Sequence, residues 1–266
     1  MAARALVKQV AAGFDRLVPP PEGVVVLIYH RVGGGSPSEV DLDVGVFAEQ
    51  MAHLVEHHRV LSLDDAVEAL ASGDPVGGVV VTFDDGTTDF ADHVVPVLVE
   101  HRVPATLYVA TKFVDEQEEF PWGAPPITWS ALRDATSTGL VTIGSHTHAH
   151  WLMDRLEPAM IADDLHRSID LIGEHLGSRP EHFAYPKALP GSPEAEIAVR
   201  RRFRSAALAA NRVNRPGRTD LHRIWRTPVQ RADGPRFFAA KAAGGMRLEG
   251  ELRSIVSKAK YRGMSR

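Results

Sequence analysis

The chain has 266 residues, of which 44% are hydrophobic and 24% are charged, the composition of an ordinary globular protein. Its formal net charge of −4 provides no global field that would attract nucleic acid, so nucleic acid is not an expected partner. The chain has no cysteine, which excludes disulfides and thiolate metal sites and leaves His, Asp and Glu as metal ligands.

The segment over residues 1–18 is amphipathic and mildly basic, which predicts a helix. Lys8, Asp15 and Arg16 interrupt its apolar residues, so it lacks the continuous apolar core of a secretory signal. No apolar run in the chain is long enough for a membrane span. The chain as written is therefore predicted to be cytoplasmic, with peripheral membrane contact through this helix as an alternative. Three prolines at 19–21 end the segment, which predicts a helix and linker over 1–21 and one domain over 22–266.

Short apolar runs rich in β-branched residues alternate with segments of helical periodicity along the rest of the chain. We expect strands at 24–29, 79–83, 105–109, 141–143, 182–184 and 206–208. We expect helices at 47–58, 64–71, 89–102, 129–138, 158–176, 193–203 and 235–257, the second of them capped by Ser62. The stretch between 209 and 234 has no defined pattern. This alternation predicts an α/β fold with a mostly parallel sheet.

Two absences favour a (β/α) barrel over a doubly wound sheet that binds nucleotides. No GxGxxG follows the first expected strand, and no phosphate loop of the GxxxxGK type occurs in the chain. In such barrels the active site lies at the carboxyl ends of the strands. His30, the pair Asp84-Asp85, His146 and Tyr185 each come just after an expected strand, so they are expected at one rim of the barrel.

The adjacent carboxylates Asp84 and Asp85 end a buried apolar strand, where they are costly unless a cation neutralises them. An alternative is that Asp85 only caps the helix that follows. A second group, His146 and His150, has the spacing that places two imidazoles on one face of a helical turn. A histidine-rich surface turn is the alternative there. Together the two groups indicate a facial His, His, Asp site for one divalent metal ion.

These motifs resemble those of the polysaccharide deacetylase family, also called the NodB homology family or carbohydrate esterase family four. The segment at 82–86 (TFDDG) is similar to its first motif and the segment at 146–150 (HTHAH) to its second. Residues 26–32 (VLIYHRV) and 183–186 (FAYP) are similar to the branch that acts on poly-β-1,6-linked N-acetylglucosamine. The resemblance covers roughly 24–229 and implies a distorted barrel of about seven parallel strands.

The resemblance also implies a role for each residue of the site. Asp84 would be the general base, and Asp85, His146 and His150 would bind the metal, most suitably zinc, with nickel, cobalt, manganese and iron as alternatives. His30 would be the general acid, as in the branch just named, although a histidine at a strand end can also be purely structural.

The chain departs from the family pattern in its third motif, where Lys187 follows Tyr-Pro and the arginine that supports the base is missing. Arg226 is the predicted substitute, with Arg223 as a second choice and a surface ion pair as the alternative for either. Tyr185, Lys187 and Trp151 are predicted to contact the substrate. The other tryptophans at 122 and 129 could also border a sugar groove, and any of these aromatic residues could instead belong to the core.

The predicted function is metal-dependent hydrolysis that removes acetyl groups from N-acetylglucosamine-type sugars or polysaccharide, so the expected partner is carbohydrate. Two other functions stay open: a barrel hydrolase acting on another C–N bond, such as a deformylase or a ureide- or imide-cleaving enzyme, and a catalytically silent carbohydrate-binding homologue. The departures in the third motif favour the silent homologue, and the complete Asp, Asp, His, His set disfavours it.

Overall fold

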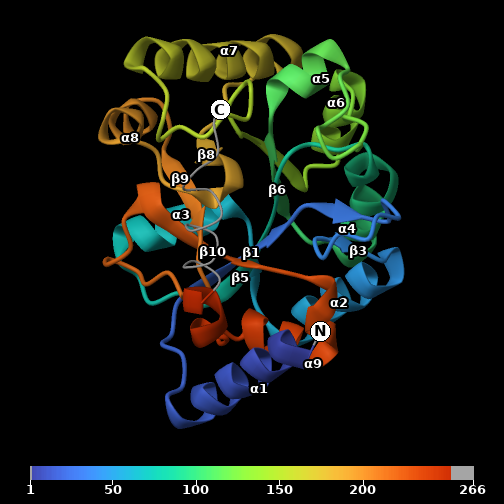
Figure 1. Ribbon diagram of the computed structural model, residues 1–266, viewed down its shortest axis with the longest axis vertical. Coiled ribbons are helices and arrows are strands. Elements are labelled where there is room, and N and C mark those ends of the chain that lie inside the picture. The colour runs from blue at the N-terminus through green and yellow to red at the C-terminus, as the bar shows by residue number, and fades with distance from the viewer. Residues whose placement is uncertain (1, 253–266) are drawn as a thin grey trace.

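Seven parallel strands close into a barrel in the computed structural model, which describes residues 2–252, with side chains from residue 7 onward except that of residue 16 (Figure 1). The ring closes because β1 pairs with both β5 and β10. Around the ring the strands are β1 (Val24–Tyr29), β5 (Gly78–Phe83), β6 (Ala105–Val109), β7 (Val141–Ser145), β8 (His182–Ala184), β9 (Ser205–Ala209) and β10 (Ile224–Pro228). The predicted barrel of about seven parallel strands is therefore confirmed.

Three further strands are short. β4 (Val60–Leu61) pairs with the first half of β5, while β2 (Arg31–Val32) and β3 (Asp41–Leu42) form a separate parallel pair just after β1. The barrel is closely packed at β7, where a Cβ on Gly144 would lie 2.5 Å from the Tyr108 ring and 3.0 Å from a backbone oxygen of β8. Only glycine leaves room there for the Tyr108 side chain.

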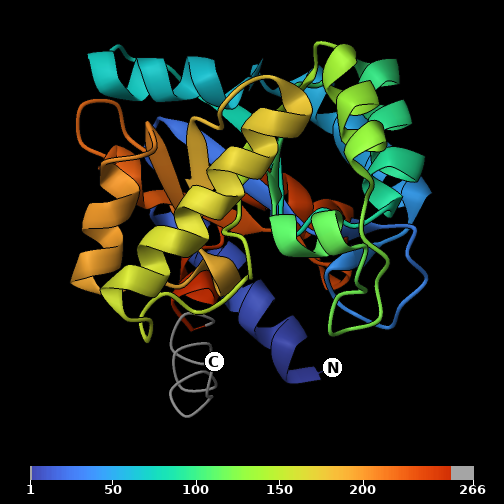
Figure 2. The ribbon, with the colours of Figure 1, turned by 90° about the horizontal axis from the view of Figure 1, so that it is seen from above.

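Helices surround the strands (Figure 2). They are α1 (Ala2–Leu17), α2 (Val44–His57), α3 (Leu63–Ser72), α4 (Val95–His101), α5 (Thr111–Glu116), α6 (Trp129–Ser137), α7 (Pro158–Leu176), α8 (Pro193–Arg200) and α9 (Gly234–Ala242). Shorter helical turns are η1 (Phe90–Val94), η2 (Pro186–Ala188), η3 (Leu221–Arg223) and η4 (Arg231–Asp233). In Figure 1, α1 and α9 lie at one end of the molecule and α7 at the other.

The alternation of side chains along the strands divides the core into layers. The outward residues of β1, β5 and β6 pack against α2, α4, α6 and α9. The outward residues of β8 and β9 pack against α7 and α8. The inward residues, among them Val26, Val80 and Tyr108, pack with α3.

Most predicted elements are present, with differences that have local causes. The strands at 24–29, 105–109 and 182–184 and the helix at 158–176 have the predicted bounds, and Ser62 caps α3 as predicted. α2 begins three residues early because Asp43 caps it and accepts hydrogen bonds from the N–H groups of Gly45 and Val46, the second and third residues of the helix. The helix predicted at 89–102 begins as the π-helical turn η1, and the one predicted at 193–203 ends at Arg200. β10 and α5 were not predicted.

The long last helix predicted at 235–257 is wrong. α9 ends at Ala242, and the chain turns through Gly244, whose φ of 84° is left-handed, before it is helical again over 247–252. The remainder of the predicted helix, 253–257, lies outside the described residues.

α1 packs against α9 through buried charges. The Lys8 ammonium contacts the carboxylates of Asp233 and Glu249, and Lys241 of α9 reaches the same two carboxylates. All four residues are at most 7% exposed, so the pairs are not screened by solvent. No helix within residues 2–252 has the length and hydropathy needed to cross a membrane.

Candidate active site

Two loops bring acidic and histidine side chains together at one rim of the barrel. Asp84 and Asp85 follow β5, and the segment from His146 to His150 follows β7, which is separated from β5 only by β6. Neighbouring residues of an extended chain point to opposite sides. Asp85, however, has a left-handed backbone with φ of 77°, and both carboxylates reach Nε2 of His146, at 3.8 Å for Asp84 and 3.6 Å for Asp85.

Asp85, His146 and His150 form the one cluster within residues 2–252 whose acidic and histidine side chains could hold a metal ion. One ligand atom of each lies within 4.8 Å of the others, and Asp85 Oδ1 is 3.3 Å from His150 Nε2. Nδ1 of His146 donates to the Ala184 carbonyl at 2.8 Å, which leaves Nε2 with a free lone pair when the ring is neutral. This donor set fits a divalent ion.

Burial and neighbouring groups set the protonation states of Asp85 and His146. Burial alone would raise the pKa of Asp85, but the hydrogen bond and charge of His150 hold it below its usual range. Burial lowers the pKa of His146 to about 4, despite the two nearby carboxylates. The carboxylate is therefore ionised and the His146 imidazole neutral at neutral pH.

The second motif is a loop, which contradicts the predicted turn of helix. Thr147 and His150 both have left-handed backbones, with φ of 68° and 58°. Asp164 of α7 holds the loop, since its carboxylate accepts N–H groups of His148 and Ala149, each at 2.9 Å. Asp164 is only 6% exposed. Sequence reasoning missed it, because an aspartate in an amphipathic helix resembles any surface aspartate.

Asp84 forms a bidentate ion pair with Arg226 of β10. The two N–O distances are 2.5 and 2.9 Å, and both side chains are at most 2% exposed. The guanidinium lies inside the barrel, 5.1 Å from the centre of the Tyr108 ring. Burial would raise the pKa of Asp84, but the charge and hydrogen bonds of Arg226, together with the nearby histidines, lower it below its usual range. The second choice, Arg223, instead pairs with Glu196.

His30 borders a cavity of about 560 Å³ that also reaches Asp84 and Lys187. Its Nδ1 is buried and has no hydrogen-bond partner among residues 2–252. The His30 imidazole lies close enough to Asp84 and Asp85 to contribute to the lowered pKa of both carboxyls. The structure thus brings His30 to the same rim as the other predicted site residues.

The three predicted substrate contacts lie in different surroundings. Lys187 is exposed in a left-handed turn and lies 4.7 Å from the centre of the Trp122 ring. Trp151 is 36% exposed. The Tyr185 side chain is 1% exposed and packs in the core against Phe183, so it presents no ring to the cavity.

Trp122 lies beside the candidate metal ligand His150. Its ring is 40% exposed and its centre is 6.0 Å from that of His150. Phe120 stacks behind it with centres 4.9 Å apart. The sequence named Trp122 as one of several aromatics that could border a groove, and only the fold of the loop before α6 distinguishes it.

The chain is similar in sequence and in fold to known deacetylases. A model described as polysaccharide deacetylase matches residues 72–199. Chitooligosaccharide deacetylase of Bradyrhizobium sp. (strain ANU 289) is 33% identical over 122 residues, which cover 46% of this chain and 46% of that protein. Poly-beta-1,6-N-acetyl-D-glucosamine N-deacetylase of Escherichia coli (strain K12) is 29% identical over 141 residues, which cover 48% of this chain and 21% of that protein.

The matches therefore span less than half the length of these curated relatives. Among solved structures, IcaB from Ammonifex degensii superposes with a TM-score of 0.74 at 27% identity, over 84% of this chain and 98% of that chain. The range of the family model contains Asp84, Asp85 and the two histidines of the cluster, whereas His30 and Arg226 lie outside it.

Proposed function

We propose that this chain hydrolyses the acetamide bond of N-acetylglucosamine-type sugars and releases acetate, as its match to the polysaccharide deacetylase model over residues 72–199 suggests. The convergence of Asp85, His146 and His150 beside a buried Asp84–Arg226 pair carries this proposal. Two relatives are named for acting on chitooligosaccharide and on poly-β-1,6-N-acetylglucosamine, which supports an oligomer of this sugar as substrate.

Asp85, His146 and His150 would hold one divalent ion. Two imidazoles and one carboxylate suit zinc best, and nickel, cobalt, manganese and iron also accept this set. When bound, the ion supplies Lewis-acid chemistry that polarises the acetamide carbonyl and lowers the pKa of water. His146 is held for this task by the Ala184 carbonyl, which fixes both the tautomer and the direction of the ring.

Asp84 is the proposed general base. Its carboxylate is ionised at neutral pH, and Arg226 fixes the direction of both oxygens. It would accept the proton of the attacking water, and its position 3.8 Å from Nε2 of the candidate ligand His146 supports this role. Arg226 acts on the reaction only through Asp84 and is therefore a positioning residue.

His30 is the proposed general acid, because the free amine can leave only after its nitrogen gains a proton. An imidazolium donates such a proton readily, and the Nδ1 of His30 has no competing partner within residues 2–252. A backbone N–H in the left-handed turn at Lys187 would bind the developing oxyanion.

Sugar contacts would come from the exposed side chains around the cavity. Lys187 and Trp151 are proposed to contact the substrate, and Trp122 offers a ring face beside His150. Tyr185 contributes only the backbone of its turn, because its side chain is buried. Tests with free and polymeric sugars would define how far these contacts extend.

The decisive experiment measures acetate release from chitooligosaccharides and from β-1,6-linked oligomers after removal of metal and after reloading with zinc. We expect activity only in the reloaded protein. His150→Ala should lose both zinc and activity, while Asp84→Asn and His30→Asn should keep zinc and lose most turnover.

His148→Asn is the matched control, because His148 lies in the same loop and instead contacts Thr111. It should keep both zinc and activity. Full activity of the metal-free protein, or of His150→Ala, would contradict the proposal. Release of formate or ammonia in place of acetate would indicate a hydrolase of another C–N bond, and sugar binding without turnover a silent homologue.

A further inference from the structure

The outward face of α1 carries a stripe of exposed apolar side chains. Val10, Phe14 and Leu17 recur at the spacing of one helix face, and Val18 extends the stripe just beyond the helix. Their exposed fractions are 57%, 38%, 83% and 54%. We call these four residues the apolar stripe. Such a contiguous apolar face on a helix indicates an interaction surface rather than a scattered exposed residue.

The opposite face of α1 is firmly attached, so the stripe is presented in a fixed orientation. Ala11 is fully buried, and Lys8 contacts the carboxylate of Asp233. The Asp15 carboxylate accepts the backbone N–H of Met246 at 2.6 Å. The helix therefore cannot simply rotate its apolar residues into the protein core.

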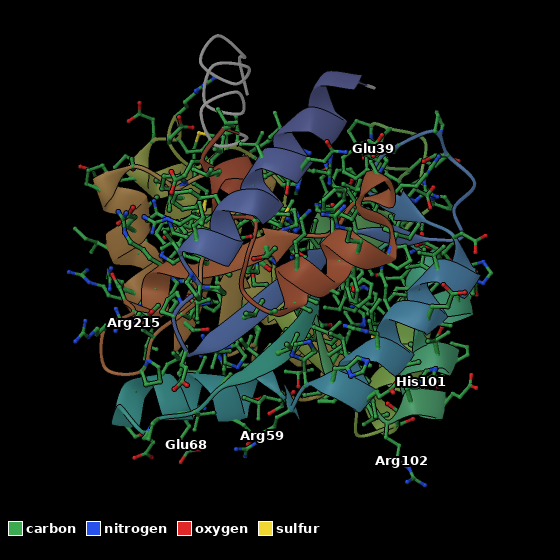
Figure 3. The ribbon with its side chains drawn as sticks, turned by 90° about the horizontal axis from the view of Figure 1, so that it is seen from below. Glu39, Arg59, Glu68, His101, Arg102 and Arg215 are labelled. Carbon is green, nitrogen blue, oxygen red and sulfur yellow. The ribbon has the colours of Figure 1, made fainter. Side chains whose placement is uncertain are left out.

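A group of arginines lies beside the stripe. Phe14 and Val18 line a cavity of about 470 Å³ together with Arg215, Arg218 and Arg247. All three arginines are exposed, and among the residues that the structure describes their side chains have no ion pair or hydrogen bond. We call them the arginine cluster. Figure 3 shows Arg215 at the edge of the face that α1 crosses.

The charge around this cavity is predominantly positive. Two further arginines line it, and each is already paired, Arg212 with Glu251 and Arg223 with Glu196. Two aspartates also line the cavity. Asp220 pairs with Arg200, which lies outside the cavity, and the Asp15 carboxylate accepts the backbone N–H of Met246. The positive charge left over belongs to the arginine cluster.

We propose that the apolar stripe and the arginine cluster together dock the protein on the surface of a membrane that contains anionic phospholipid. Apolar side chains enter the boundary between headgroups and acyl chains, and the adjacent guanidinium groups bind phosphates by paired hydrogen bonds. A symmetric contact with a second copy is disfavoured, because it would bring two arginine clusters together.

The proposed membrane face adjoins the mouth of the active-site cavity. Asn211, Arg212, Arg223 and Trp225 line both that cavity and the cavity of the arginine cluster. A protein docked in this way would hold the entrance to Asp84 and His30 beside the lipid surface. Docking itself does not depend on the proposed deacetylase activity.

The test is co-sedimentation of the full chain with vesicles of phosphatidylcholine alone and of phosphatidylcholine mixed with phosphatidylglycerol. We expect binding to the mixed vesicles, weaker binding as salt is raised, and little binding to phosphatidylcholine alone. Phe14→Ser with Leu17→Ser should weaken binding by at least about tenfold. Arg215→Gln, Arg218→Gln and Arg247→Gln together should weaken it by about a hundredfold, or about fivefold for each charge.

Matched controls use exposed residues of the same kinds elsewhere on the surface. Val55→Ser with Val99→Ser alters side chains that are 50% and 47% exposed, and Arg59→Gln with Arg102→Gln alters arginines at another edge of the same view (Figure 3). The controls should bind as the unmodified protein does, and all variants should keep its melting temperature.

Absence of binding to the mixed vesicles would overturn the proposal, as would equal losses in the test and control variants. Sedimentation velocity distinguishes the remaining explanation. If the unmodified protein is a dimer that does not bind vesicles, and the Phe14→Ser, Leu17→Ser variant is a monomer, the apolar stripe is a contact between two copies of the chain instead.

Discussion

Asp164 is predicted to determine the metal affinity of the site without touching the metal. Its carboxylate accepts the N–H groups of His148 and Ala149 and so holds the loop that returns His150 to His146. We expect Asp164→Ala to lower zinc affinity by about a hundredfold and Asp164→Asn by about tenfold, within the range known for groups that orient metal ligands. The smaller loss follows because an amide oxygen can still accept one of the two N–H groups.

The magnitude follows from a balance within the loop. A hydrogen bond to a charged acceptor contributes about 1.5–3 kcal/mol, so the two bonds to Asp164 contribute about 3–6 kcal/mol. The left-handed backbones at Thr147 and His150 cost about 1–2 kcal/mol each, or about 2–4 kcal/mol together. The stabilisation from the two hydrogen bonds and the cost of the two left-handed backbones are therefore similar. Without the Asp164 bonds, the loop relaxes away from the conformation that brings His150 to His146. The 2.9 Å bond from the His150 N–H to Thr147 Oγ1 remains and limits the change.

The assay is competition for zinc between the protein and a chromophoric chelator, with urea unfolding of each metal-free variant as a second measurement. Asp163→Asn is the matched control, because Asp163 is the exposed neighbour of Asp164 on the same helix. Unchanged zinc affinity of Asp164→Ala would refute the reasoning. So would an equal loss in Asp163→Asn, which would attribute the effect to the charge of α7.

Three further predictions concern stability. Arg226→Met leaves the buried Asp84 carboxylate without its cation, and the free energy of unfolding in urea should fall by about 3–5 kcal/mol. Lys8→Met removes a buried ammonium from two carboxylates and should lower the same quantity by a similar amount, about 3–5 kcal/mol. The hydrogen bond and charge of His182 lower the pKa of Asp64, so this pair stabilises the protein above about pH 4 and its contribution is lost as the pH falls through the lowered pKa. Asp64→Asn should remove that dependence from melting temperatures measured against pH, and should cost less than about 1 kcal/mol at neutral pH because the Asp64 side chain is 44% exposed.

The barrel was predictable because six of its strands are short, apolar and alternate with helices. β10 was missed because its sequence, Ile-Trp-Arg-Thr-Pro, has a charged residue at its centre. Arg226 points into the barrel, where Asp84 neutralises it and Tyr108 covers it. A strand with an inward arginine at its centre therefore has the local sequence pattern of a loop. Only the contact between Arg226 and Asp84 across the barrel explains why this segment is a strand.

The candidate ligands were predictable from residue types and spacing, but the conformation of their loop was not. A spacing of four between His146 and His150 fits a helical turn, and the loop reaches a similar convergence with two left-handed residues. What permits this backbone is long-range: the carboxylate of Asp164, sixteen residues from His148, supplies the bonds that a helix would have made internally. No local pattern contains that information.

The left-handed backbone at Asp85 leads to a prediction that separates ligand loss from backbone strain. With φ of 77°, an alanine at this position keeps the strain, whereas a glycine adopts the same backbone without a Cβ clash. Asp85→Ala and Asp85→Gly both remove the carboxylate, so both should fail to bind zinc. The glycine variant should nevertheless unfold at a higher urea concentration. Its free energy of unfolding should exceed that of the alanine variant by about 1 kcal/mol, after allowance for the greater freedom of its unfolded chain.

Both variants should be unfolded in the presence of a chelator, so that metal does not contribute to either transition. Asp84 serves as the control position, because the structure reports no left-handed backbone there and Asp84→Gly should be less stable than Asp84→Ala. Equal stability of the two Asp85 variants would mean that the backbone at this position is not strained.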